Sequence, residues 1–434
     1  MSGDTARKSA CATLVIGMEK SGLASVEFLL EHGARVTAAD TRALAEIPRA
    51  REALERWNVP FHLQSETSFA DFDLIVLSPG VPADLPGLSG RKVIGEVELA
   101  APDLQGPTIG ITGTNGKTTT TAMVGHILNT AGVPAQIGGN IGTPVTAMTK
   151  SSRPDQWNVL ELSSFQLETI RTFHARVGVC LNVTQNHLDR HHTLEKYAAA
   201  KSNLFRTQSK EDFAVLNEND AECVKFAALA RGTVVWFNRT RLPVTGLPVR
   251  GQHNIENAMA AAAAARLAGV TEEAIAEALS TFRAVEHRLE FVRNVSGVDF
   301  YNDSKATSVD ATLKALESFE GRLWVILGGK DKGSNYSLLL APLKAKACAV
   351  LLIGKAAPKI AEDLGALGDA VPLIESGTLD NAVREAYRRA APGDTVLLAP
   401  ACASFDQFQS FEQRGKVFKE LVTALTPKSN GTTT

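Results

Sequence analysis

Short apolar runs separated by longer amphipathic stretches form the main pattern of this chain. In the first hundred residues the apolar runs 12–16, 34–39 and 73–77 predict buried strands, and the stretch ending at His32 predicts a helix between the first two. Strands that alternate with helices are typical of a doubly wound parallel sheet, which binds ligands at the carboxyl ends of its strands.

The same pattern restarts twice further along the chain. Strands are predicted at 107–112, 158–162 and 177–183, with helices at 119–130, 254–267 and 271–282, the last capped by Thr271; three more strands are predicted at 323–327, 347–353 and 395–399. A chain of 434 residues is too long for one ordinary core. We therefore predict an α/β protein of three domains: a Rossmann-like parallel sheet over 1–97, a central P-loop ATPase-like domain over 98–284 and a Rossmann-like domain over 285–434.

Two polar segments interrupt this pattern. The proline-containing segment 101–107 predicts a linker into the second domain, and the tail 427–434 is polar and predicted to be disordered.

Composition excludes several classes of protein. The formal net charge of −2 gives no electrostatic case for nucleic acid or an anionic membrane as a partner. No apolar run approaches the roughly 18–20 residues that span a bilayer, and the alanine-rich stretch 258–268, interrupted by Arg266, predicts a close-packed helix. The first ten residues lack the apolar core of a signal peptide. Five widely spaced cysteines form neither a disulfide framework nor a zinc pattern, so we expect a cytoplasmic protein.

The most informative segment runs from Gly110 to Thr119, with the sequence GITGTNGKTT. A predicted strand enters this glycine-rich turn and a predicted helix leaves it, an arrangement that aims backbone N–H groups at a phosphate. Lys117 would reach the β- and γ-phosphates, and the Thr118 hydroxyl would face Mg²⁺. Ile111 stands where the strict P-loop pattern has its first glycine. The segment predicts an ATP or GTP site, which kinases, ATPases, GTPases and ligases share.

A second glycine-containing turn, from Gly17 to Gly22, nearly matches the dinucleotide fingerprint, and Asp40 follows about twenty residues later, as an NAD-binding acid would. Glu19, however, replaces the glycine at which the backbone approaches a pyrophosphate, and its carboxylate would repel phosphates. The turn therefore supports the fold and argues against NAD.

Three further residue types carry candidate chemistry. Glu161 ends a predicted strand. From there its carboxylate would either reach an ion held by the phosphate loop or serve only as a negative charge at the N-terminus of a helix. His187 and His191 have the i, i+4 spacing of a zinc pair, but the glutamate of H-E-x-x-H is absent, and a surface histidine cluster is the alternative. Lys201, taken alone, reads as a solvated helix lysine.

Read as one set, these motifs resemble the Mur ligases, and within them the members that add glutamate. The resemblance spans nearly the whole chain in order. It rests on the ATP loop with its Ile111 and on six further segments: Gly138 to Gly142, Glu161 to Glu168, Gly251 to Ala258, Asn302 to Thr307, Ala401 to Phe408, and Phe411 to Gly415.

The resemblance implies an amide ligation in peptidoglycan precursor synthesis, and so a role in cell-wall biogenesis, cell shape and cell division. ATP would phosphorylate the carboxylate of UDP-N-acetylmuramoyl-L-alanine, and the amino group of D-glutamate would attack the acyl phosphate. The residues themselves fit either enantiomer of glutamate. The implied partners are small molecules only, the implied cofactors are ATP and two Mg²⁺ ions, and the implied quaternary state is a monomer.

The resemblance also implies a role for individual residues. Lys117, Glu161, His187 and Lys201 would be catalytic; Thr118, Glu161, His187 and Lys201, the last as a carbamate formed with CO₂, would hold Mg²⁺. ATP would contact Gly113, Thr114, Asn115, Gly116, Lys117, Thr118, Thr119, Asn254, Asn257, Arg288 and Asp303. The UDP-sugar would contact Asp40, Thr41, Ser78, Gly80 and Asn140, and glutamate would contact Thr307, Lys332, Ser404 and Phe411. Asn186 stands where many members have Asp, which bears on how the His187 ring is oriented.

Two alternatives remain beside this interpretation. One is another ligase of the same fold, adding a different amino acid or extending folate, although the DNPR-type motif of the diaminopimelate or lysine ligases is missing. The other is a nucleotide-sensing or NAD-binding module without ligase activity, which would require Lys117, Glu161, His187 and Lys201 to be incidental.

Overall fold

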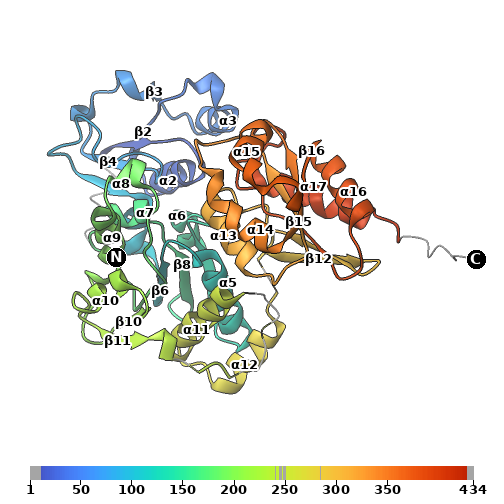
Figure 1. Cartoon of the computed structure of the whole chain (residues 1–434). Coiled ribbons are helices and arrows are strands. Elements are labelled where there is room, and N and C mark those ends of the chain that lie inside the picture. The colour runs from blue at the N-terminus through green and yellow to red at the C-terminus, as the bar shows by residue number, and fades with distance from the viewer. Residues whose placement is uncertain (1–10, 240, 244–246, 248–250, 284, 428–434) are drawn as a thin grey trace, which may run out of the picture. The chain divides into compact units, whose positions relative to one another are not determined.

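The computed structural model describes residues 11–239, 241–243, 247, 251–283 and 285–427. They fall into two compact units, Met1–Gly246 with Ile255–Thr281, and Leu247–Asn254 with Phe282–Thr434. The first unit contains two sheets and the second contains one (Figure 1). No helix in the described part of the chain is long and apolar enough to cross a membrane. The predicted tail lies almost entirely outside the described residues, and so do the first ten residues.

The N-terminal sheet has five parallel strands in the order β3-β2-β1-β4-β5. Helices α2 and α3 bury Val26, Phe28 and Leu54 against one face, whereas apolar residues of the loops cover the other. The three strands predicted here are confirmed. The elements are β1 (Ala12–Ile16), α2 (Lys20–Glu31), β2 (Arg35–Asp40), α3 (Pro48–Trp57), β3 (Phe61–Leu63), β4 (Leu74–Leu77), β5 (Val93–Gly95) and α4 (Glu96–Ala100).

The central sheet has six parallel strands in the order β11-β10-β9-β6-β8-β7. Its strands are β6 (Thr108–Thr112), β7 (Ala135–Gly139), β8 (Trp157–Glu161), β9 (Val177–Cys180), β10 (Phe213–Leu216) and β11 (Thr233–Trp236). Its helices are α5 (Lys117–Thr130), α6 (Val145–Met148), α7 (Ser164–Glu168), α8 (Leu188–His191), α9 (Leu194–Ser202), α10 (Ala221–Ala227), α11 (Gln252–Leu267) and α12 (Glu272–Thr281).

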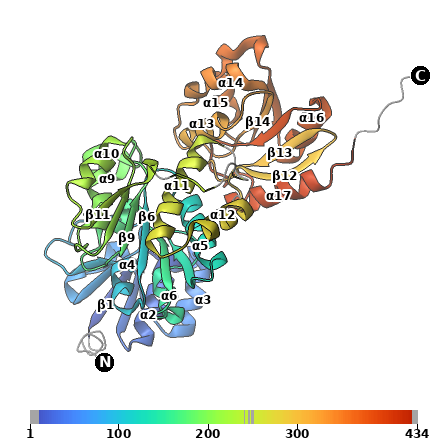
Figure 2. The ribbon, with the colours of Figure 1, turned by 90° about the horizontal axis from the view of Figure 1, so that it is seen from below.

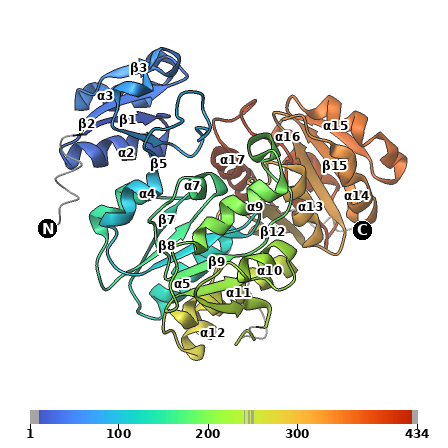
Figure 3. The ribbon, with the colours of Figure 1, turned by 90° about the vertical axis from the view of Figure 1, so that its left-hand side faces the viewer.

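Helices cover both faces of this central sheet. α5 packs on β7 and β8 and against α12 (Figure 2), and α9 lies beside α7 on the other face (Figure 3). The alanines of α11, Ala258 and 260–265, are all buried, which confirms the close-packed helix. Thr271 Oγ1 accepts from the Ala274 N–H at the start of α12, as predicted. α5 begins at Lys117, two residues earlier than predicted, because the helix starts directly from the loop.

The third sheet has the order β12-β13-β17-β14-β15-β16 and is parallel except for the β12–β13 hairpin, which was not predicted. α13, α14 and α15 cover one face, and α16 and α17 cover the other (Figure 1). The elements are β12 (Glu290–Val295), β13 (Val298–Asn302), α13 (Val309–Glu317), β14 (Leu323–Gly328), α14 (Leu340–Lys346), β15 (Ala347–Ile353), α15 (Ala357–Asp363), β16 (Leu373–Gly377), α16 (Leu379–Arg389), β17 (Thr395–Leu398) and α17 (Phe411–Thr423).

Candidate active site

The loop between β6 and α5 is the centre of the candidate site. Gly113 and Gly116 have φ angles of +149° and +85°, a region that residues with a Cβ rarely adopt. Gly116 is also packed closely, because a Cβ placed there would lie 2.2 Å from Asn257 Oδ1. The glycines thus let the chain turn directly into the N-terminus of a 14-residue helix, where the helix dipole favours an anion.

The loop is held in place by the segment that follows β9. The Thr114 N–H donates to the Asn182 backbone oxygen at 2.8 Å and to Asn182 Oδ1 at 3.1 Å, and the Asn115 N–H donates to the same Oδ1 at 2.9 Å. The Thr184 N–H donates to Thr114 Oγ1 at 2.9 Å. The shape of the loop is therefore held by hydrogen bonds from the protein itself. Sequence reasoning assigned Asn182 no role; its place directly after a buried strand, at the sheet edge that carries the loop, was the available signal.

Two lysines converge on one carbonyl of this loop. Lys117 Nζ donates to Gly113 O at 3.0 Å and to Thr114 O at 2.8 Å, and Lys201 Nζ donates to the same Gly113 O at 2.8 Å. Lys201 is only 1% exposed, so its interpretation as a solvated helix lysine is wrong. Burial, with a smaller contribution from the Lys117 cation, lowers the pKa of Lys201 to about 7. A large part of the Lys201 amine is therefore neutral at neutral pH.

Tyr197, another residue without a predicted role, lies beside this pair. Its ring centroid is 4.5 Å from Lys201 Nζ, and its hydroxyl donates to Thr114 Oγ1 at 3.3 Å.

Glu161 ends β8 at the same edge of the sheet as the loop, as predicted. Asn140 Nδ2 donates to Glu161 Oε1 at 2.9 Å, whereas Glu161 Oε2 is buried with no hydrogen-bond partner among the described residues. A buried carboxylate oxygen without a partner is costly, and carboxylate oxygen is the donor that Mg²⁺ prefers. Within the described residues no three His, Cys, Asp or Glu side chains cluster as a metal site. Glu161 Oε2 is therefore a donor that fits one position on a Mg²⁺ ion.

The two histidines of the predicted zinc spacing have different surroundings. His187 is exposed, has φ +54° and makes an edge contact with Phe165 at 5.0 Å between ring centroids. His191 is buried, with Nε2 at 2.9 Å from Ser164 Oγ and Nδ1 at 3.2 Å from Glu168 Oε1. Both ring nitrogens of His191 are thus engaged by protein groups, which removes the zinc pair as an interpretation. The metal role of His187 stays a prediction.

Four of the five residues predicted to bind the UDP-sugar lie at the ends of β2 and β4, beside the turn that follows β1, whereas Asn140 follows β7 of the central sheet. Asp40 Oδ2 accepts the Met18 N–H at 2.7 Å, and Ser78 Oγ donates to Gly17 O at 2.6 Å, so both side chains shape the turn after β1. Burial raises the pKa of the Asp40 carboxyl, but hydrogen bonds from Arg42 and Met18 outweigh it and hold this pKa below its ordinary value. Glu19 pairs with Arg42 at 2.8 Å. Thr41 and Gly80 are exposed at this edge.

Four of the residues predicted around ATP lie close to the loop or in the second unit. Asn257 Oδ1 accepts from Thr120 Oγ1 at 3.3 Å, which ties α11 to α5. Asn254, Arg288 and Asp303 belong to the second unit. There Arg288 Nε is buried with no hydrogen-bond partner among the described residues, and burial raises the pKa of Asp303 to about 6 against the opposing effect of Arg288. Their contact with ATP stays a prediction.

The residues predicted to bind glutamate lie together within the second unit. Lys332 is exposed, with Nζ 3.5 Å from Thr307 O, and Ser404 is buried in the segment after β17. Phe411 begins α17, and its backbone oxygen accepts from Ser304 Oγ at 2.8 Å. Arg414, which was not predicted, is fully buried and donates to Ser304 and Cys402, so it joins these segments.

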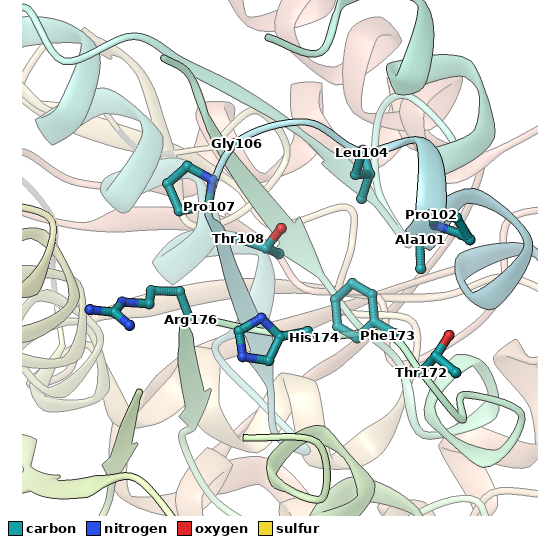
Figure 4. Close-up of a pocket in the computed structure, with 10 residues that line it drawn as sticks. All are labelled: Ala101, Pro102, Leu104, Gly106, Pro107, Thr108, Thr172, Phe173, His174 and Arg176. Carbon is teal, nitrogen blue, oxygen red and sulfur yellow. The ribbon is translucent and has the colours of Figure 1, made fainter. Parts of the chain in front are cut away.

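A separate pocket opens at the opposite edge of the central sheet (Figure 4). It has a volume of about 420 Å³ and is lined by the 101–108 connection and by residues 172–176, which precede β9. Its two basic side chains pair with one buried carboxylate: His174 Nε2 lies 2.8 Å and Arg176 Nη1 3.4 Å from Asp212. Because the phosphate loop lies at the carboxyl ends of the strands, this pocket is not part of the candidate site.

We expect Gly116→Ala to lower the free energy of unfolding and to weaken ATP binding. Strain at φ +85° costs about 1–2 kcal/mol, and the new Cβ would also displace Asn257. Denaturant unfolding and ATP titration measure the two effects. Gly132→Ala is the matched control, because Gly132 has φ +75° and nothing within 4 Å of its Cβ. Equal destabilisation by the two variants, with ATP binding retained, would contradict the assigned packing.

Comparisons with known proteins bear on what this site does. The Mur ligase MurD-like N-terminal domain matches residues 11–95, the Mur ligase middle domain matches residues 111–241, and the Mur ligase glutamate ligase domain matches residues 287–402. A UDP-N-acetylmuramoylalanine--D-glutamate ligase of Solibacter usitatus is 60% identical over 440 residues, covering 96% of this chain and 98% of that protein. A protein of the same name from Acidobacterium capsulatum is 48% identical, covering 95% and 96%.

Solved structures show the same fold at low identity. The UDP-N-acetylmuramate-alanine ligase MurC of Thermotoga maritima has a TM-score of 0.59 at 18% identity, covering 95% of this chain and 99% of that one. The pseudomurein peptide ligase type C of Methanothermus fervidus has a TM-score of 0.57 at 19% identity, covering 95% and 99%.

Proposed function

The chain belongs to the Mur ligase family, and from this premise we propose that it joins D-glutamate to UDP-N-acetylmuramoyl-L-alanine at the cost of ATP. The family membership makes it an ATP-dependent ligase of peptidoglycan precursor synthesis. The observation that carries the proposal is the site itself: a phosphate loop held by Asn182, two lysines on the Gly113 carbonyl, and a carboxylate with one oxygen that has no partner among the described residues. The relative at 60% identity supports the choice of substrates. We place the reaction in the cytoplasm.

The chemistry needs an activated carboxylate, because an ionised carboxylate repels nucleophiles and has no good leaving group. In the first step an alanyl carboxylate oxygen forms a bond to the γ-phosphorus of ATP, and the bond to the β–γ bridging oxygen breaks to release ADP. In the second step the glutamate amine attacks the acyl carbon, loses a proton, and expels inorganic phosphate. What the protein supplies is positioning and charge stabilisation.

Individual side chains take defined roles in this scheme. Lys117, already at the loop, exchanges its carbonyl partners for the γ-phosphate and neutralises it during transfer. Thr118 and Glu161 would hold one Mg²⁺, and His187 would contribute to a second. Bound there, the ions would neutralise phosphate oxygens. Asn140 orients Glu161 through its hydrogen bond.

Lys201 is proposed to act as a carbamate. Only a neutral amine adds to CO₂, and burial beside Lys117 gives this lysine a lowered pKa of about 7. The product is an anion next to Lys117, so the modification adds an attraction to the Lys117 cation that the neutral amine lacks. The carbamate oxygens would also help to position Mg²⁺.

Phosphate release from ATP and Mg²⁺ tests the proposed reaction. With UDP-N-acetylmuramoyl-L-alanine present, release is expected to require D-glutamate, and L-glutamate or no amino acid is expected to give little. Preference for L-glutamate would keep the chemistry and change the product. Release without the nucleotide sugar, or no release under any condition, would contradict the assigned substrates and point first to other acceptors used by ligases of this fold.

A further inference from the structure

The loop that carries Lys332 is held in shape by the neighbouring Asp331. Asp331 Oδ2 accepts the Gly333 N–H at 3.0 Å, and Oδ1 accepts the Ser334 N–H at 3.1 Å. Lys359 of α15 reinforces this turn, donating to Asp331 Oδ2 at 3.2 Å and to Ser334 O at 2.7 Å. Desolvation raises the pKa of Asp331, but a hydrogen bond from the Tyr336 hydroxyl, together with those from Ser334, Gly333 and Lys359, outweighs it and holds the pKa well below its ordinary value, so the carboxylate stays ionised.

Tyr336 connects this turn to the segment that carries Ser404. Its side chain is fully buried; the hydroxyl donates to Asp331 Oδ1 at 2.7 Å and lies 2.9 Å from Cys402 Sγ. A phenol has one hydroxyl proton, and Tyr336 donates it in the hydrogen bond to Asp331. In the contact with Cys402 the thiol is therefore the donor and the Tyr336 oxygen is the acceptor. A hydrogen-bonded chain therefore runs from Cys402, two residues before Ser404, to Asp331, which directly precedes Lys332.

The two segments extend two paired strands, because Leu323–Ile326 of β14 pair with Thr395–Leu398 of β17. Beyond these strands the Gly328 N–H donates to Pro400 O at 2.9 Å, and Lys330 and Ala403 exchange backbone hydrogen bonds of 2.8 and 3.2 Å. Glutamate presents two carboxylates at a nearly fixed separation, so a cation and a hydroxyl that bind them need a fixed spacing as well. Past the Lys330–Ala403 contact, the Tyr336 hydroxyl is a side-chain contact that joins the two segments.

We propose that Tyr336 is a positioning residue for the amino-acid substrate, fixing the Lys332 loop against the Ser404 segment through Asp331 and Cys402. The inference rests on the proposed function, because it takes Lys332 and Ser404 as the glutamate contacts. Tyr336 itself touches no substrate. A merely structural role, in which the hydroxyl only satisfies a partly buried carboxylate, predicts a change in stability and no change in substrate affinity.

The test is a steady-state comparison of Tyr336→Phe with the wild-type enzyme. KM for D-glutamate is expected to rise about tenfold, the size of one hydrogen bond to a charged group. The kcat and the KM values for ATP and for the nucleotide sugar are expected to stay within about twofold, since those sites do not depend on this spacing. Lys359→Met removes the hydrogen bonds from Lys359 Nζ to Asp331 and Ser334, which hold the same turn. This variant is expected to raise KM for D-glutamate too.

Tyr387→Phe is the matched control. Tyr387 is also buried in this unit, and its hydroxyl donates to Thr426 O at 2.9 Å on the opposite face of the sheet. This control is expected to lose stability without any change in KM. Unchanged KM for D-glutamate in folded Tyr336→Phe, or in Lys359→Met should the first variant not fold, would overturn the inference while leaving the proposed function intact. A wild-type protein that turns over without needing glutamate would overturn the proposed function, and the inference with it.

Discussion

Lys117→Ala is expected to abolish turnover while the protein still folds. The Lys117 ammonium donates hydrogen bonds to the Gly113 and Thr114 carbonyls of the loop and does not lie in an apolar core. Its loss therefore removes little packing. Its role in the proposed reaction is to neutralise charge that develops on the γ-phosphoryl group. Loss of one such group from a preorganised site typically slows a reaction at least about a hundredfold. The rate of phosphate release with all three substrates measures the effect.

Lys225→Ala is the control for the loss of a positive charge in the same unit. Lys225 is exposed on α10, pairs with Glu222, and lies outside the candidate site, so its removal is expected to leave the rate unchanged. Thermal unfolding of both variants checks that the fold is kept. Retention of more than a few per cent of the wild-type rate by Lys117→Ala would remove the phosphate role from this residue.

Lys201→Ala is expected to cause a loss of similar size, with partial recovery in millimolar formate or acetate. The buried amine occupies space beside Gly113 O and Thr112 Oγ1, and truncation leaves room there for a small carboxylic acid. If the working form is a carbamate, an added carboxylate supplies the same planar anion at the same place. Sodium chloride at equal ionic strength is the control, because it changes screening without supplying a carboxylate.

A second readout makes the carbamate test decisive. Wild-type protein in ¹³C-labelled bicarbonate is expected to show a carbamate carbon resonance that Lys201→Ala lacks. The unmodified amine reacts only when neutral, so the resonance should grow as the pH rises through about 7, the lowered pKa of Lys201. Absence of both the resonance and the rescue would contradict the carbamate.

The parts of the site that could be predicted from sequence are those set by local chain geometry. The phosphate loop is contiguous, so its glycines and Lys117 identify it directly. Glu161 could be placed because buried parallel strands all present their carboxyl ends at one edge, and the structure puts β8 next to β6. In both cases the signal itself lies within one strand or one turn.

The parts that could not be predicted depend on which elements become neighbours. Lys201 sits among alanines on α9, and nothing in that run indicates that α9 covers the sheet and buries the amine. Asn182 acts on the loop only because β9 lies directly beside β6. His187 and His191 are four residues apart, as on one face of a helix. His187, however, has a left-handed backbone conformation and precedes the four-residue helix that contains His191, so the two rings have different partners. Spacing alone carried no information on any of these contacts.

The anchoring of Thr114 and Asn115 by Asn182 bears on how the loop would be inhibited. A loop that the protein itself holds in shape loses little conformational entropy when a ligand binds. The conformational entropy lost on binding is then mainly that of the ligand. Rigid molecules that have the shape of a nucleotide's diphosphate group should therefore bind more tightly than flexible molecules of equal size. A ligand whose shape does not match the loop is expected to bind weakly, because the loop does not rearrange to fit it.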